Sequence, residues 1–228
     1  MKNQKLVIIG DSAFAEIAYE YFTCDSEYDV VAFAVESAFY TKDELFGKPV
    51  IHFDDIEKLF PPTHCSVYVA ITYTGLNRVR TRLVQEVRAK GYALASYISS
   101  RAFVWRNVTI GEHCFIFEDN TIQPFVSLGD NVVIWSGNHI GHHSIIGNNC
   151  FISSHVVLSG FTSVGNNCFI GVNATISNNV TIHEDCWLGL GVTLHQDAPA
   201  GSFYKPQKFD PATKSTYDYF KIVRREGR

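Results

Sequence analysis

Three histidines stand close together near the middle of the 228-residue chain, at His139, His142 and His143, and His155 follows them. A histidine side chain titrates near neutral pH, so it can accept a proton from an attacking hydroxyl or amine. Two other interpretations stay open: a hydrated surface turn with ordinary histidines, and a three-histidine zinc site. Because the spacing shows no column of metal ligands, we expect a general base and no metal.

The histidines lie within a repeat of six residues. Aliphatic side chains recur at every sixth position in an unbroken column from Ile98 to Leu194. An α-helix or a hairpin sheet lacks this period, whereas a three-sided coil of short strands repeats every eighteen residues. The column then fills the interior, so Ile140 points inward and the neighbouring histidines lie at corner and outer positions. Residues 98–204 are therefore expected to form a parallel β-helix.

Glycines and cysteines follow the same spacing. Four glycines fall eighteen residues apart and are expected to stack along one edge, where a corner needs unusual backbone angles: Gly111, Gly129, Gly147 and Gly165. Four cysteines share one internal column: Cys114, Cys150, Cys168 and Cys186. With no CxxC pair in the chain, we interpret these cysteines as small packing residues rather than as a disulfide or metal cluster.

The first 97 residues alternate strand-like and helix-like segments. A buried strand is expected at Leu6–Ile9, followed by a turn at residues 10–12 and a helix at 13–22. Further strands are expected at residues 30–35 and 67–71, and a second helix at 77–90. This order predicts an α/β, Rossmann-like domain over residues 1–97, and residues 205–228 form a C-terminal tail.

Composition narrows the possible partners and location. The net charge of −4 comes without a basic stripe, which argues against nucleic-acid binding. The apolar run Leu6–Ile9 is too short for a signal peptide or a membrane span. We therefore expect a cytoplasmic protein with no nucleic-acid or membrane partner.

The α/β unit, the segment Gly47-Lys48-Pro49-Val50 and the hexapeptide coil together resemble the bacterial sugar acyltransferases, which include sialic acid O-acetyltransferases and nucleotide-linked 4-amino-sugar N-acetyltransferases. The resemblance covers almost the whole chain and implies a left-handed coil, a homotrimer and acetyl-CoA as cosubstrate. The family's general base is a histidine followed by Asp or Glu. His142 matches this base, but His143 stands where the carboxylate is usual.

The same resemblance implies binding residues. For the nucleotide sugar, these are Gly10, Asp11, Ser12, Phe14, Glu36, Thr72, Tyr73, Asn77, Arg80, Asn138 and His139. For coenzyme A, in a groove between neighbouring coils of the trimer, they are Phe151, His155, Gly160, Asn173, Ala174, Gly189 and Gly191. The glycines could equally be structural corners.

The expected function is acetyl transfer from acetyl-CoA to the amino group of a nucleotide-linked amino-deoxy sugar of the 4-amino-4,6-dideoxy type, in surface glycan or lipopolysaccharide assembly. A sugar hydroxyl as acceptor is the first alternative. A metal-dependent lyase or a non-catalytic scaffold on the same coil is the second. A trimer is also expected because Trp135, Phe151 and Phe161 would otherwise be exposed.

Overall fold

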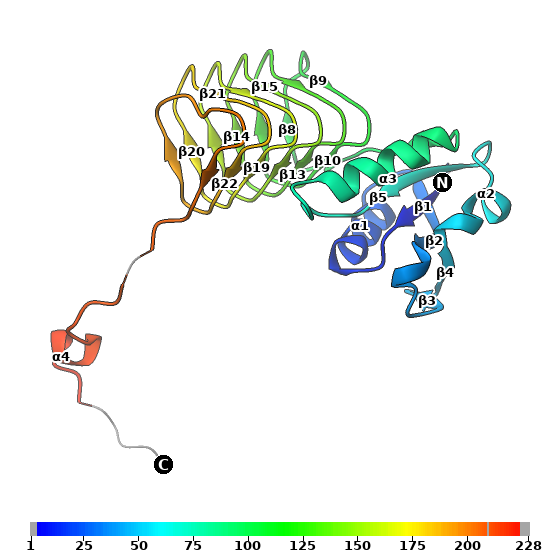
Figure 1. The fold of residues 1–228 in the computed structure, drawn as a ribbon, viewed down its shortest axis with the longest axis horizontal. Coiled ribbons are helices and arrows are strands. Elements are labelled where there is room, and N and C mark those ends of the chain that lie inside the picture. The colour runs from blue at the N-terminus through cyan, green and yellow to red at the C-terminus, as the bar shows by residue number, and fades with distance from the viewer. Residues whose placement is uncertain (1–3, 209, 224–228) are drawn as a thin grey trace.

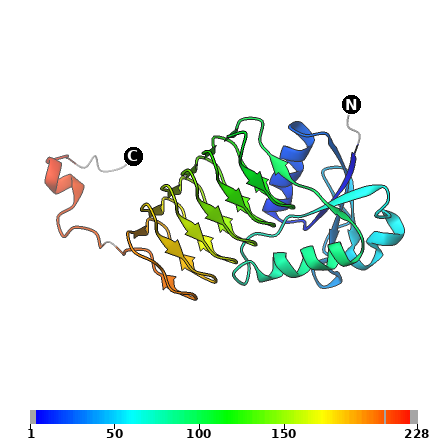
Figure 2. The ribbon, with the colours of Figure 1, turned by 90° about the horizontal axis from the view of Figure 1, so that it is seen from above.

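The computed structural model describes residues 4–208 and 210–223. The chain forms an N-terminal α/β domain, a coil of stacked short strands and a C-terminal tail (Figure 1). Figure 2 shows the strands of the coil in a row that leads away from the N-terminal domain. No helix in these residues is long and apolar enough to cross a bilayer.

The N-terminal domain is a twisted sheet of strand order β3-β4-β2-β1-β5-β6, parallel except for the β3–β4 pair. Two long helices cover its two faces, because alternate residues of β1 pack with α1 (Leu6, Ile8) and with α3 (Val7, Ile9). The expected strands and helices of this half are present to within three residues. The elements are β1 (Gln4–Ile9), α1 (Ala13–Cys24), β2 (Tyr28–Val35), η1 (Ser37–Phe39), β3 (Glu44–Leu45), β4 (Lys48–His52), η2 (Phe53–Asp55), α2 (Ile56–Leu59), β5 (Cys65–Val69), α3 (Arg78–Ala89) and β6 (Ala93–Leu94).

The coil is a left-handed parallel β-helix with three sheets of two-residue strands. Each strand pairs with the strand eighteen residues away, except that β22 pairs with β24 sixteen residues further on. The first sheet holds β7 (Tyr97–Ile98), β10 (Phe115–Ile116), β13 (Val133–Ile134), β16 (Phe151–Ile152), β19 (Phe169–Ile170), β22 (Trp187–Leu188) and β24 (Phe203–Tyr204). The second holds β8 (Phe103–Val104), β11 (Thr121–Ile122), β14 (His139–Ile140), β17 (Val157–Leu158), β20 (Thr175–Ile176) and β23 (Thr193–Leu194). The third holds β9 (Thr109–Ile110), β12 (Ser127–Leu128), β15 (Ile145–Ile146), β18 (Ser163–Val164) and β21 (Thr181–Ile182).

The interior of the coil is filled as the six-residue period predicts. From Ile116 to Leu194 every residue of the aliphatic column is buried in one continuous cluster. The expectation fails at the start of the column, where Val104 and Ile110 are only partly buried and Ile98 is 42% exposed. The four in-column cysteines belong to the same cluster and carry free thiols. Their interpretation as packing residues is confirmed.

The four glycines that recur every eighteen residues do not supply the unusual backbone angles at the corners of the coil. The residues with φ between +57° and +76° are not Gly111 and its equivalents but a mixed set: His113, Asn131, Asn149, Asn167 and Asp185 at one corner; Asp119, Gly137, His155, Asn173 and Gly191 at the next; Phe125, His143, Phe161 and Asn179 at the third. Asparagine tolerates this conformation better than most residues. A Cβ on Gly129 would instead lie 2.9 Å from the backbone nitrogen of Asn148. These glycines therefore permit close approach of successive coils, and the prediction that they supply unusual backbone angles is wrong.

The N-terminal domain docks on the first sheet of the coil. The outward side chains Phe115 and Phe151 are buried against this domain, and Phe115 meets Phe22 of α1 at 5.6 Å between ring centroids. Trp135 packs in the same cluster. Of the three aromatics expected to face a trimer partner, only Phe161 is largely exposed, at 52%.

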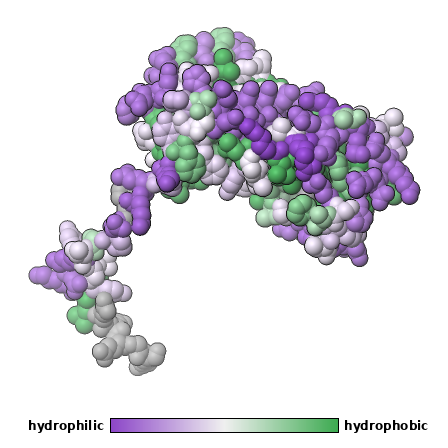
Figure 3. Space-filling model, viewed as in Figure 1, coloured by the Kyte–Doolittle hydropathy of each residue, from purple (hydrophilic) through white to green (hydrophobic). Residues whose placement is uncertain are grey.

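Helix α3 fastens this arrangement along the first corner of the coil. Arg88 reaches Glu112 at 3.0 Å, Arg80 reaches the carbonyl of Cys150 at 3.2 Å, and Arg78 reaches Asp185 at 2.5 Å. Hydrophilic side chains follow the outer side of this helix in the space-filling view (Figure 3). The chain then leaves the coil through an extended tail that carries α4 (Thr216–Phe220), away from the body (Figure 1).

Candidate active site

His142 and His143 lie at the third corner of the coil, between β14 and β15, and both are exposed. Their Nδ1 atoms are 3.1 Å apart, which is hydrogen-bond distance. Within the described residues, no hydrogen bond or ion pair joins either imidazole to a carboxylate. A second imidazole thus occupies the place of the carboxylate in the family's pair.

A glycine seats the His142 ring. A Cβ on Gly160, one coil further on, would lie 2.7 Å from Cε1 and 2.8 Å from Nε2 of His142, so the ring rests directly on that backbone. The backbone N–H of His142 donates to Gln123 Oε1 at 3.0 Å. Gly160 is itself buried, so its place is under the imidazole rather than in an open cofactor groove.

Two phenylalanines enclose the His143 ring. Phe125 stacks on one face at 4.6 Å and 27°, and Phe161 on the other at 4.7 Å and 16°. All three occupy the same left-handed corner in successive coils. Sequence reasoning missed Gln123 and Phe125, although their positions eighteen residues from Gly141 and His143 could have indicated them.

The other coil residues that were expected near the substrate lie at three different places in the structure. His139 is half-exposed on the outward side of β14, next to the pair. Asn138 is buried and bridges coils, accepting from the backbone N–H of Val156 at 2.6 Å, so its assignment to substrate binding is wrong. His155 is exposed but stands at the second corner, over Gly137, where a Cβ would lie 2.6 Å from its ring. The structure therefore separates His155 from His142.

A cavity of about 280 Å³ opens at the carboxyl ends of β1 and β2. It brings together four of the expected residues, Gly10, Asp11, Ser12 and Glu36, with Phe39 at its rim. This is the edge where open parallel sheets bind ligands. The residues after β5 contribute Ile71 and Thr74 rather than the expected Thr72 and Tyr73; Thr72 offers its carbonyl to Arg80 at 2.6 Å.

Charged groups line the two ends of this cavity. Glu36 pairs with Arg82 at 2.9 Å, and Asp11 pairs with Lys42 at 3.5 Å. The Lys42 ammonium also donates to the Asp11 carbonyl at 3.0 Å, beside the N-terminus of α1. A helix N-terminus with a lysine ammonium beside it suits a phosphate group. Sequence reasoning missed Lys42, which lies far from the turn along the chain.

Several other expected binding residues are structural, and their assignments are wrong. Arg80 and Asn77 are fully buried and hold α3 to the coil, Asn77 through the carbonyls of Asn167 and Cys168. Phe14 and Phe151 lie in the aromatic core between domain and coil. Tyr73 also contacts this core, at 4.5 Å from the Phe169 ring, but it is 40% exposed, so its assignment to substrate binding stays a prediction. Ala174 is inside the coil.

The remaining cofactor residues lie toward the far end of the coil. Asn173 and Gly191 are exposed at the second corner. Gly189 is buried, with Pro206 where its Cβ would be. Gly191 borders a cavity of about 700 Å³ with His195 and Lys205.

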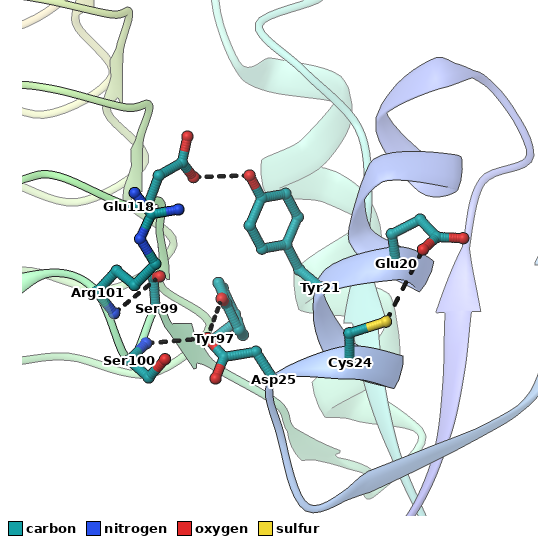
Figure 4. A pocket seen from close by; sticks show the side chains of 9 residues that line it. All are labelled: Glu20, Tyr21, Cys24, Asp25, Tyr97, Ser99, Ser100, Arg101 and Glu118. Carbon is teal, nitrogen blue, oxygen red and sulfur yellow. Dashed lines mark hydrogen bonds between the residues drawn. The ribbon is translucent and has the colours of Figure 1, made fainter.

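A third cavity, of about 350 Å³, lies between α1 and the first coils (Figure 4). The Tyr21 hydroxyl and the Ser136 hydroxyl donate to Glu118 at 2.6 and 2.7 Å. Burial raises the pKa of Glu118, but these two hydrogen bonds outweigh it, so the net pKa lies below its ordinary value. Tyr97 likewise donates to Asp25 at 2.7 Å. These carboxylates are already engaged, so the cavity serves as part of the seam between domain and coil.

The centre of the seam is a buried cluster around Arg80 and His113. The backbone N–H of Val69 donates to His113 Nε2 at 2.8 Å, so Nδ1 carries the proton and donates to Asn131 Oδ1 at 3.0 Å. Burial, with the Arg80 cation adding to it, lowers the pKa of His113 to about 3. Arg80 donates to the same Asn131 oxygen at 2.9 Å. Burial lowers the pKa of Arg80 to about 10, so its guanidinium stays charged at neutral pH.

Comparisons with known proteins agree with this architecture. Residues 125–160 match the bacterial transferase hexapeptide (six repeats), and residues 161–196 match the hexapeptide repeat of succinyl-transferase. No curated protein sequence matches the chain.

Solved structures resemble nearly the whole chain. The acetyltransferase domain of PglB from Neisseria gonorrhoeae, also solved with acetyl coenzyme A, is 24% identical at a TM-score of 0.81, over 90% of this chain and 97% of that one. A variant of perosamine N-acetyltransferase from Caulobacter crescentus, in complex with CoA and GDP-perosamine, is 27% identical at a TM-score of 0.79, over 89% and 93%. WeeI from Acinetobacter baumannii is 21% identical at 0.63, over 88% and 95%. Residues 125–196 thus carry the hexapeptide repeats of bacterial transferases, and nearly the whole chain is similar in fold to bacterial sugar acetyltransferases.

Proposed function

We propose that this protein transfers the acetyl group of acetyl-CoA to the amino group of a nucleotide-linked amino-deoxy sugar. The observation that carries the proposal is the presence, in one chain, of an exposed imidazole at a coil corner and a cavity of about 280 Å³ at the carboxyl ends of β1 and β2 in the N-terminal domain. The likeness to a perosamine N-acetyltransferase solved with CoA and a GDP-linked amino sugar supports the substrate class. A 4-amino-4,6-dideoxy sugar for surface glycans such as lipopolysaccharide is the specific substrate that we propose.

In the proposed reaction, His142 Nε2 accepts the amine proton as the nitrogen attacks the thioester carbon. The carbon–nitrogen bond forms, the carbon–sulfur bond breaks, and the leaving thiolate receives the proton from His142. The Asp11–Lys42 end of the cavity would hold the diphosphate, and Glu36 the ribose or base. Coenzyme A would lie along the outer side of the coil near Asn173 and Gly191.

We also propose a homotrimer in the cytoplasm. Large apolar side chains surround His142 on the free surfaces of the coil, and Phe125, Ile145 and Phe161 are each more than half exposed. A neighbouring coil would cover them. The six free thiols suit a reducing compartment.

The direct test incubates the full chain with acetyl-CoA and a panel of nucleotide-linked 4-amino-4,6-dideoxy sugars. Release of the CoA thiol and a mass gain of one acetyl group on the nucleotide sugar are the expected results. Matched sugars with a hydroxyl in place of the amine serve as controls, and a no-substrate blank corrects for the exposed Cys24 thiol. Acetylation of the hydroxyl sugars alone would establish an O-acetyltransferase, and no transfer to any acceptor would refute the proposal.

A further inference from the structure

The third corner of the coil carries an unusual pair of residues on either side of His143. Bulky side chains are strained at positive φ, and the coil otherwise places Asn, Asp, His or Gly there, for example Asn149, Asn173 and Asn179. Phe125 and Phe161 adopt φ of +65° and +59° in the coils directly before and after His143. Strain of this kind persists where surrounding interactions require it, and it concentrates at functional sites.

The two rings fix the plane of the imidazole between them. Their stacking distances to His143, 4.6 and 4.7 Å, and small interplanar angles leave little freedom to rotate about the side-chain bonds. Phe161 also meets His142 edge-on, at 5.1 Å and 90°. The rings therefore hold the His143 imidazole in the plane in which its Nδ1 lies 3.1 Å from His142 Nδ1.

Only one hydrogen can lie between the two Nδ1 atoms, which are 3.1 Å apart. If His143 donates, its partner holds its own proton on Nε2 and is no base at that atom. If His142 donates, its Nε2 lone pair is free for the amine proton, and His143 carries its proton on Nε2. The pair is thus useful for catalysis in one arrangement of hydrogens.

We propose that His143 is the positioning residue that keeps His142 in the Nδ1–H form, and that Phe125 and Phe161 are kept at a strained corner to hold His143 in place. This inference rests on the proposed function. When His142 Nε2 takes the amine proton, the positive charge is shared through the Nδ1–H···Nδ1 hydrogen bond, and the same proton later passes from His142 Nε2 to the leaving thiolate. A neutral imidazole in this way replaces the carboxylate of the family's usual pair.

The experiment compares His143→Phe, which keeps the ring stack but removes the acceptor, with His143→Asp, which supplies a carboxylate acceptor and tolerates the left-handed corner. We expect His143→Phe to lower kcat by about 10- to 100-fold, as loss of a partner to other functional imidazoles does, with KM nearly unchanged. His143→Asp should regain most of kcat. Phe161→Leu should fall between them, while Phe103→Leu, an exposed aromatic at the first strand of the second sheet, should behave as the wild type.

A second readout does not depend on activity. Nitrogen-15 spectra of histidine-labelled full-length protein should show His142 as the Nδ1–H tautomer in the wild type and shifted toward Nε2–H in His143→Phe. Wild-type kcat in His143→Phe, or a wild-type His142 in the Nε2–H form, would overturn the inference. Failure of the wild type to acetylate any nucleotide-linked amino sugar would refute the proposed function instead, and the spectra would still report on the pair.

Discussion

At the scale of single residues, His142 combines exposure with an immobilised ring. Its imidazole rests on Gly160, and its Nδ1 faces a second imidazole, so the ring cannot turn freely. Preorganisation of this kind is what general-base catalysis needs.

We therefore expect His142→Ala to lower turnover by at least about a hundredfold, since general bases contribute roughly 10²–10⁴ in rate. Coenzyme A affinity, measured by calorimetry, should be nearly unchanged. His183→Ala is the matched control, because that histidine is exposed on the same coil, just after β21, and is assigned to no site. Near-native turnover in His142→Ala would show that the amine arrives deprotonated and that positioning alone suffices.

The glycine under His142 gives a separate prediction. In Gly160→Ala the new Cβ would lie 2.7 Å from His142 Cε1, so this exposed ring must move. Turnover should fall by about tenfold or more with little change in melting temperature. In Gly129→Ala the new Cβ meets backbone of the next coil, which cannot move, so stability should fall by about 1–3 kcal/mol. Equal destabilisation of the two variants would contradict this distinction.

At the scale of elements, the contact between α3 and the coil depends on a buried cation, Arg80, that has no carboxylate partner among residues 4–208 and 210–223. Arg80 is fully buried and donates to carbonyls of the loop after β5 and of two successive coils, the shortest bond being 2.6 Å to Thr72. Carbonyl dipoles and the Asn131 amide oxygen therefore stabilise the guanidinium.

Arg80→Met should leave those acceptors unsatisfied and destabilise the protein by at least about 2 kcal/mol. Arg82→Met, two residues along the same helix, removes two half-exposed ion pairs, to Glu36 and Glu86, and should cost about 1 kcal/mol or less. Chemical denaturation monitored by circular dichroism compares the two variants. A similar effect from both would show that the buried hydrogen bonds contribute little.

The sequence predicts the coil better than it predicts the seam. The six-residue period alone separates inward from outward residues. The burial of Ile140 and of the cysteine column can therefore be predicted from the spacing. It cannot tell that the N-terminal domain covers one side of the coil, so Arg80, Asn77 and Phe14 look like ligands when they are contacts between domain and coil. A polar residue that is buried at a domain contact cannot be distinguished in the sequence from one that is exposed for ligand binding. The distinction requires knowledge of the surface that packs against it.

At the scale of the whole molecule, the seam makes stability depend on pH. His113 is held neutral in the fold with a pKa of about 3, whereas an unfolded histidine titrates near 6.5. Between those values the unfolded chain binds more protons, so stability falls as the pH falls and is independent of this group above about pH 7.

Melting temperature should therefore decline from about pH 7 to about pH 5, and His113→Asn should be less stable at neutral pH but show a shallower decline. The Glu118 carboxylate, whose pKa is lowered, contributes only at more acidic pH. An unchanged slope in His113→Asn would assign the pH dependence to other groups.

Assembly is the second prediction at this scale. Light scattering on the full chain should give the mass of a trimer, because the apolar side chains on the two uncovered sides of the coil need a partner. Ile145→Glu, at a position 56% exposed, should yield folded monomers. Thr109→Glu, on the same sheet two coils earlier, is the control. A monomeric wild type at micromolar concentration would refute the proposed assembly.

Helix α3 also limits how the length of this protein can change. Its twelve residues span about 18 Å, and its side chains reach from Glu112 to Asp185, four coil steps of about 4.8 Å each. Helix and coil are therefore matched in length over this stretch. An extra eighteen-residue turn inserted beyond Asp185 would lengthen the β-helix without disturbing that match. The same insertion between Asn131 and Asn149 would displace every later contact by one coil, so tolerated insertions are expected to cluster toward the C-terminal end.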